Sequence, residues 1–111
     1  IRTFRERYPD KPIMISESGV KAVYGNHDMA ASIDSEEMQR EYLIDIFETL
    51  WNNPEVCGFS IWQMNDTRTY SRNSEMQPGK PYMGHSAAGI FNEQRLPKLS
   101  ARTVRHYFNK K

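Results

Sequence analysis

Two short apolar runs, each with polar residues directly after it, organise this chain. The first run covers residues 12–16, and Glu17 follows it at once. The second covers residues 56–62 and is followed by Gln63, Asn65 and Asp66. Apolar runs of this length, bounded by turn-forming residues, are typical of buried β-strands. We therefore expect strands at 13–16 and 56–62.

The segment between the two runs has helical periodicity. Apolar residues recur there at three- and four-residue spacing, which predicts one buried stripe: Met38, Tyr42, Leu43, Ile46, Phe47 and Leu50. Asp34, with Glu37 three residues later, fits a capping box, so a helix is expected over 35–51. Residues 1–8 resemble the tail of a helix, and Pro97 opens a last helix to about residue 109, with Ala101, Val104 and Phe108 facing inward.

Strand, helix and strand in this order form a βαβ unit, which implies parallel strands. The carboxyl ends of parallel strands meet at one edge, where α/β proteins build their active sites. A carboxylate such as Glu17 at the end of a buried strand is costly unless it meets water, a partner or a substrate. The two strand ends thus predict one shared pocket. Residues 65–88 have no periodicity and are expected to form a long loop.

Length and composition narrow the possibilities. The 111 residues suit one domain at most, and two parallel strands cannot cover both faces of a sheet or close a barrel, so the chain is expected to be a piece of a larger α/β domain. Fifteen basic and fourteen acidic residues give no reason to invoke nucleic acid or a membrane surface. The single cysteine, Cys57, is expected to be a small buried apolar residue. No compartment is predicted.

Five segments, in order along the chain, resemble the catalytic barrel of glycoside hydrolase family 2, and its β-glucuronidase-like branch in particular. Residues 11–19 resemble the seventh-strand motif and residues 56–66 the eighth strand with its exit. The other matching segments are 25–27, 35–42 and 89–98. The resemblance implies an α/β fold in which residues 1–111 are the C-terminal portion, about the last two βα units, of a (β/α)₈ TIM barrel, without strands one to six and the N-terminal β-domains.

The resemblance also implies the activity of a retaining β-glycosidase that hydrolyses terminal β-glycosidic bonds. Glu17 would be the nucleophile, and Trp62 would line the sugar subsite with Asp66 in support; Asn65 and His27 are further candidates for substrate binding. The family's acid/base Glu lies on the fourth strand, which this chain lacks, so the fragment alone is expected to be inactive. No cofactor is expected, and the partners are a carbohydrate and either the rest of the barrel or further copies of the chain.

The sugar is predicted from one departure from the family pattern. β-Glucuronidases carry an Asn-x-Lys motif just before the Gly-Ile-Phe stretch, where it grips the sugar carboxylate. This chain has Ser86, Ala87 and Ala88 there. Because a carboxylate needs charged donors, a neutral sugar, as in a β-galactosidase, is favoured over a glucuronide.

Three other interpretations compete with this one. The first is a non-catalytic carbohydrate-binding or degenerate barrel segment, in which Trp62 binds sugar without chemistry. The second is an independent oligomerising α/β module. The third treats Glu17 as a structural carboxylate in a salt bridge or on a helix N-terminus. The three histidines have no cysteine or carboxylate at ligand spacing, so no metal site is predicted.

Overall fold

A computed structural model describes residues 1–68 and 85–110 of the chain. Its elements are α1 (Arg2–Arg7), β1 (Ile13–Ser18), α2 (Glu36–Leu50), β2 (Val56–Ile61), β3 (Thr67–Arg68), β4 (His85–Ser86) and α3 (Leu99–Phe108). β1 and β2 pair in parallel on either side of α2 in the sequence, so the predicted βαβ unit is confirmed. At the two ends of the long loop expected over 65–88, β3 and β4 pair antiparallel. The middle of that loop, residues 69–84, lies outside the described residues.

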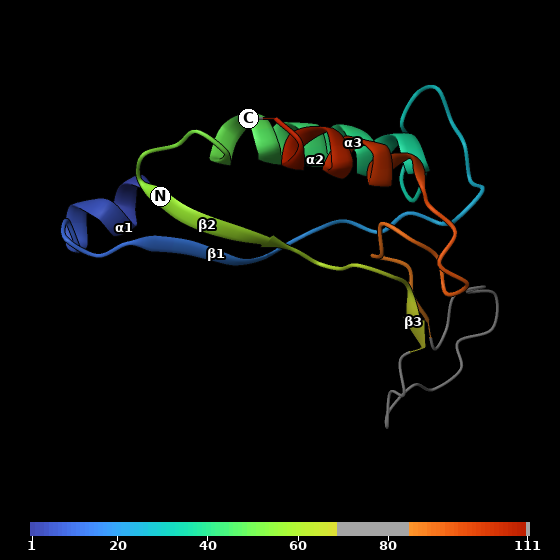
Figure 1. The fold of residues 1–111 in the computed structure, drawn as a ribbon, viewed down its shortest axis with the longest axis horizontal. Coiled ribbons are helices and arrows are strands. Elements are labelled where there is room, and N and C mark those ends of the chain that lie inside the picture. Colours follow the sequence, from blue (N-terminus) through green and yellow to red (C-terminus); the bar gives the residue numbers. More distant parts are fainter. Residues whose placement is uncertain (69–84, 111) are drawn as a thin grey trace.

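The helices α2 and α3 lie side by side over one face of the β1–β2 pair (Figure 1). A buried cluster fills the space beneath them, and it consists of Leu43, Phe47, Ile90, Val104 and Tyr107. The rings of Phe47 and Tyr107 stack with their centroids 4.3 Å apart. Burial of these large apolar side chains is the main favourable term that holds the two helices on the strands.

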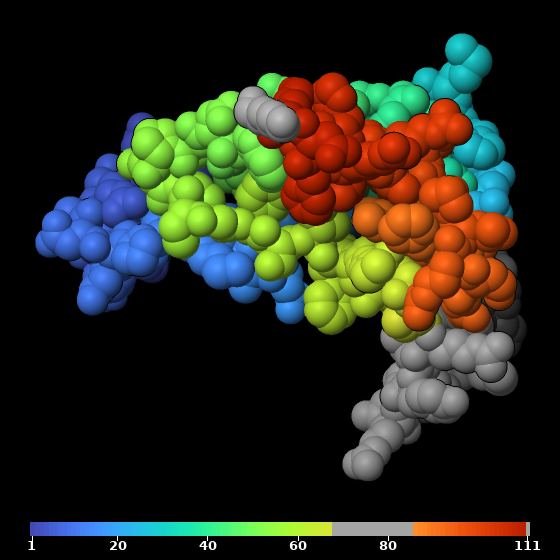
Figure 2. Space-filling view, in the orientation of Figure 1, coloured from blue at the N-terminus to red at the C-terminus, as the bar shows by residue number. Residues whose placement is uncertain are grey.

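The opposite face of the strand pair is open, which corrects the expectation of a buried first strand. The Met14 side chain is 61% exposed, and Ser16 and Glu17 are exposed as well. The reason is that, among the described residues, helices cover the strand pair on one side only (Figure 1). Parallel strands are normally covered on both faces. In the space-filling view α1 projects beyond the helical layer at one end of the molecule (Figure 2).

The start of α2 differs from the predicted capping box. Ser35, not Asp34, is the N-cap, and its hydroxyl oxygen accepts a hydrogen bond from the backbone N–H of Met38. Asp34 has a positive φ of 66° and lies outside the helix. The Glu37 carboxylate, assigned to the capping box, instead accepts from the backbone N–H of Asp28. The loop before α2 thus decided where the helix begins.

The inward faces of both helices are rotated from the predicted ones. In α2 the fully buried apolar positions are Leu43, Phe47 and Leu50, whereas Met38, Tyr42 and Ile46 are half-buried. In α3 the buried positions are Ser100, Val104 and Tyr107, which follow helical spacing along one stripe. The prediction of Val104 is confirmed. That of Phe108 is wrong, because Tyr107 takes the place against Phe47 and leaves Phe108 61% exposed.

The position of Cys57 also corrects the sequence prediction, because the side chain is exposed. Ile13 pairs with Val56 but the next residue, Met14, pairs with Gly58. Cys57 is therefore the extra residue of an irregularity in β2 and leaves the regular alternation of inward and outward side chains. Its thiol is directed at the backbone carbonyl of Ile13, 3.2 Å away.

Candidate active site

The carboxyl ends of β1 and β2 lie directly beside each other. The backbone N–H of Trp62 donates to the carbonyl of Ser18 at 2.9 Å. A Cβ atom added at Gly19 would lie 1.8 Å from the Trp62 carbonyl oxygen, so only glycine permits this approach of the two backbones. The structure thus brings together the strand ends that carry Glu17 and Trp62, as the βαβ pattern predicts.

Glu17 lies in an irregular part of β1. Ile15 pairs with Phe59 and Ser18 with Ile61, so β1 takes three residue steps where β2 takes two. The extra residue breaks the alternation of the strand, and Ser16 and Glu17 are both exposed. Bulges of this kind redirect side chains beside active sites. Within the described ranges, Glu17 has no hydrogen bond or ion pair, so no salt bridge occupies its carboxylate.

Ser18, the next residue, is buried and oriented toward the helices. Its hydroxyl lies 2.9 Å from the Tyr42 hydroxyl on α2. This hydrogen bond fixes the end of β1 to the helical layer, while Glu17 stays on the open side. The strand end therefore has one anchored residue and one accessible carboxylate.

Trp62 leaves β2 with its side chain 50% exposed. The peptide bond between Trp62 and Gln63 is cis. The Gln63 amide donates to the hydroxyls of Thr67 and Ser86, both at 3.2 Å, which fixes the segment that follows the indole. An exposed indole at a strand end offers an apolar surface to the C–H face of a sugar.

Asp66 forms a buried ion pair that the sequence did not indicate. Its Oδ1 atom lies 2.8 Å from the ammonium of Lys98, whose side chain is 0% exposed, and accepts from the backbone N–H of Gly89 at 2.9 Å. Lys98 also donates to the carbonyls of Ala22 and Ala87, at 2.6 and 3.0 Å. All three N–H groups of the ammonium are therefore used. Asp66 is held to Lys98, and its part in substrate binding stays a prediction.

The other two predicted binding residues differ in their placement. Asn65 is half-buried, pairs with Phe91 in an isolated bridge, and its amide donates to the carbonyl of Asp66. The His27 ring lies 3.0 Å from the Glu37 carboxylate, at the beginning of α2. The polar contacts of His27 are thus with α2 and not with the strand ends that carry Glu17 and Trp62.

The loop around His27 has two carboxylates with lowered pKa values. The backbone N–H of Asp28, and then the His27 ring, lower the pKa of Glu37 from its ordinary value of 4.5. A hydrogen bond with the Ser32 side chain, and then one from the backbone N–H of Ala30, lower the pKa of Asp28. Both groups are held ionised by their local hydrogen bonds, which is a structural use of charge.

Three buried polar residues escaped the sequence analysis, although their segments are part of the family resemblance. The Gln39 amide donates to the carbonyls of Val20 and Gly89, and the Glu36 carboxylate accepts from the backbone N–H groups of Gly25 and Leu99. Lys98 is the third. A polar residue on the helical repeat of an apolar stripe, such as Gln39 four residues before Leu43, is the signal that points to such a role.

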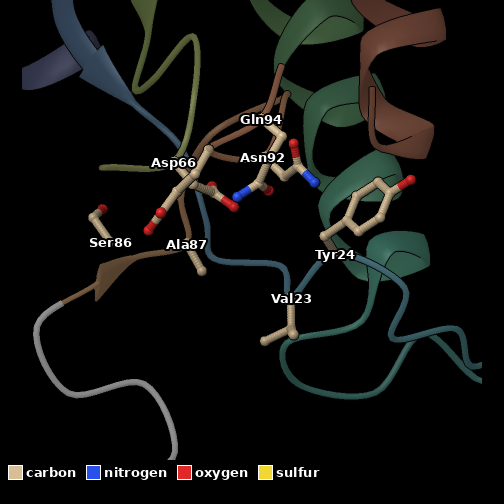
Figure 3. A pocket seen from close by; sticks show the side chains of 8 residues that line it. Val23, Tyr24, Asp66, Ser86, Ala87, Asn92 and Gln94 are labelled. Atoms are coloured by element: carbon tan, nitrogen blue, oxygen red, sulfur yellow. The ribbon is translucent and has the colours of Figure 1, made fainter. Parts of the chain in front are cut away.

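A surface hollow of about 240 Å³ lies next to Asp66 (Figure 3). Asp66, Ser86 and Ala87 form one side of it, and Val23 and Tyr24 form the other; Asn92, Glu93 and Gln94 complete its lining. Glu17 and Trp62 do not line this hollow. Both side chains are exposed outside it.

In residues 1–68 and 85–110 no group of three or more His, Cys, Asp or Glu side chains is arranged to hold a metal ion. None of the helices within these ranges has the length and hydropathy needed to cross a bilayer.

Comparison with known proteins gives consistent relatives. No family model matches the chain. The β-glucuronidase of Streptococcus agalactiae is 26% identical in an alignment 115 residues long, which spans 97% of this chain and 18% of that protein. Among solved structures, a GH2 β-galacturonidase from Eisenbergiella tayi bound to galacturonate is 30% identical with a TM-score of 0.75, over 88% of this chain and 17% of that one.

A β-glucuronidase from an uncultured Clostridium species is 26% identical with a TM-score of 0.82, and the match covers 99% of this chain and 18% of that structure. The chain thus spans less than a fifth of the length of each of these relatives. The sequence comparison and the structure comparison both match relatives of one kind over nearly the whole chain. This chain is therefore related to a segment of the family 2 glycoside hydrolases.

Proposed function

We propose that this chain forms the end of a (β/α)₈ barrel in a retaining β-glycosidase, and that Glu17 is its nucleophile. The observation that carries the proposal is the position of Glu17, unpaired within the described residues, on a bulge at the carboxyl end of a parallel strand beside Trp62. A nucleophilic carboxylate must be ionised and accessible to the anomeric carbon of the sugar. The relatives named above support the reaction class.

In this mechanism the Glu17 carboxylate attacks the anomeric carbon and forms a covalent glycosyl–enzyme bond while the leaving group departs. A second carboxyl group, about 5–5.5 Å away, protonates the departing oxygen and then activates the water that hydrolyses the intermediate. We place this second group outside the present chain. The indole of Trp62 packs against the sugar and excludes water from one side of the site.

The open face of the strand pair supports association with further strands. Met14 is exposed there, and Met64, just beyond β2, is 70% exposed. A barrel would cover this face and pair the free strand edges. The same exposed surface also suits the alternative of a homo-oligomer, which analytical ultracentrifugation of the complete protein distinguishes from a closed monomeric barrel.

Two classes of sugar compete for the site. The described residues just before Gly89, at 85–88, include no Lys or Arg that could bind a sugar carboxylate. The nearby ammonium of Lys98 is committed to Asp66, Ala22 and Ala87. This favours a neutral sugar such as a β-galactoside. The relatives, a β-glucuronidase and a β-galacturonidase, are named for uronides and so favour a uronide. We propose the neutral sugar first and the uronide as the alternative.

The test uses the complete natural protein that contains this chain. The protein is incubated with 2-deoxy-2-fluoro β-glycosides of galactose, glucose, glucuronic acid and galacturonic acid, and any covalent adduct is mapped by mass spectrometry. We expect an adduct on Glu17 that Glu17→Gln abolishes and that Glu41→Gln, at an exposed carboxylate on α2, leaves intact. The sugar that labels fastest identifies the substrate class.

A different result has a defined meaning. If the folded protein binds one of these sugars but forms no adduct, and Glu17→Gln leaves binding unchanged, the non-catalytic carbohydrate-binding interpretation replaces this one. An adduct on another carboxylate would assign the nucleophile elsewhere.

A further inference from the structure

The buried ammonium of Lys98 joins three segments that are far apart in the sequence. It donates to the Ala22 carbonyl after β1, to the Asp66 carboxylate after β2, and to the Ala87 carbonyl. Lys98 itself is the N-cap residue of α3. A methionine would fill a similar volume without the cost of burying a charge, but it would leave these three acceptors without their donor.

These contacts close a ring around the two strand ends. The backbone N–H of Trp62 is bound to the Ser18 carbonyl, which fastens β2 to β1. From Ser18 the chain runs four residues to Ala22, and from Trp62 it runs four residues to Asp66. Lys98 binds both Ala22 and Asp66, so its ammonium is the second fastening of the ring.

The segment after Trp62 is further bound to residues 88–91. The backbone N–H of Gln63 donates to the Ala88 carbonyl, and the N–H of Asp66 donates to the Phe91 carbonyl. The Ala87 carbonyl, at the beginning of this partner segment, accepts from both Lys98 and the backbone N–H of Ala22. Lys98 therefore binds the segment after Trp62, the segment that pairs with it, and the loop that follows β1.

We propose that Lys98 is a positioning residue for the reaction: through Asp66 and the Ala22 carbonyl it holds Trp62 and the end of β1 in one fixed relation. This inference rests on the proposed function, because it assigns the two positioned groups to the sugar site. Lys98 does not touch the substrate. It acts by fixing the separation of the nucleophile and the indole, and displacement of a reacting group by about 1 Å can cost about 100-fold in rate.

The test compares variants in the complete protein that contains this chain. Lys98→Met removes the ammonium but leaves Asp66 as an unpaired buried charge, which is strongly destabilising. Lys98→Met combined with Asp66→Asn removes both charges, and the Asn oxygen can still accept from Gly89. The double variant therefore has no unpaired buried charge, so a loss of activity in it reports on positioning and not on unfolding. The matched control is Tyr107→Phe, which removes the part-buried hydrogen bond from Tyr107 to Glu48, outside the ring of contacts around Lys98.

We expect the folded double variant to lose about tenfold to 100-fold in kcat, with KM changed less than about threefold. Hydrogen–deuterium exchange should rise in peptides covering residues 17–22 and 62–66 of this variant. Tyr107→Phe should leave both kcat and exchange in these peptides unchanged.

Two results would overturn the inference. One is an active wild-type protein whose double variant keeps its kcat, whether or not exchange rises, since Lys98 would then be only structural. The other is unchanged exchange in both peptides. A folded wild-type protein that hydrolyses no β-glycoside is a different outcome. It refutes the proposed function, and Lys98 then has no reacting groups to position.

Discussion

Substitution of Gly19 by alanine tests whether the two strand ends approach as closely as the structure describes. The added Cβ would lie 1.8 Å from the Trp62 carbonyl oxygen and 2.9 Å from its carbonyl carbon. Ordinary contact begins at 3.4 Å, so the oxygen must retreat by about 1.6 Å from its 1.8 Å position. Such a movement is incompatible with the 2.9 Å hydrogen bond between Trp62 and Ser18.

The cost of Gly19→Ala follows from these two effects. Overpacking of a well-packed site costs about 1–3 kcal/mol, and loss of one backbone hydrogen bond about 0.5–1.5 kcal/mol. We therefore expect the free energy of unfolding to fall by about 1.5–4.5 kcal/mol. Because Trp62 moves by more than 1 Å, kcat should also fall about 100-fold in the complete protein.

Gly58→Ala is the matched control, because a Cβ added at Gly58 meets nothing within 4 Å. It should be neutral or stabilise by up to about 1 kcal/mol, since alanine restricts the unfolded chain. Urea unfolding followed by circular dichroism measures both variants. Equal free energies of unfolding for Gly19→Ala and Gly58→Ala would refute the close approach and with it the described geometry of the site.

Three further predictions concern stability. Phe47→Ala should cost about 3–5 kcal/mol in urea unfolding, because Phe47 is fully buried among aromatic rings; a loss below about 1 kcal/mol would contradict the described core. Ser35→Ala should lower the free energy of unfolding by about 0.5–2 kcal/mol, because it removes the N-cap of α2. Asp34→Gly should not lower it, because Asp34 has a positive φ, which glycine adopts readily. A larger loss for Asp34→Gly than for Ser35→Ala would instead identify Asp34 as the cap. Because the folded-state pKa of Glu37 lies below its ordinary value of 4.5, its contribution to stability is complete above pH 4.5 and is lost as the pH falls through the lower folded value. Glu37→Gln should reduce the acid-induced loss of stability in unfolding curves measured at successive pH values, and an unchanged pH dependence would show that these hydrogen bonds do not form.

The local elements of this fold were predictable from the sequence. Apolar runs and a helical stripe depend on neighbours along the chain, so they predicted β1, α2, β2 and α3 within a few residues. The parallel pairing of the two strands followed from their order around a helix. The neighbouring positions of the strand ends that carry Glu17 and Trp62 followed from that pairing.

The tertiary structure decided which side chains the elements bury and which polar groups meet. Lys98 and Asp66 are 32 residues apart, and no local pattern links a residue before a helix to one after a strand. The strand irregularities that expose Cys57 and Glu17 depend on the register between β1 and β2. Tyr107 replaces Phe108 in the core because the position of α3 against Phe47 selects the inward face. Periodicity along a sequence specifies the elements, whereas their register and contacts depend on packing between segments that the sequence keeps far apart.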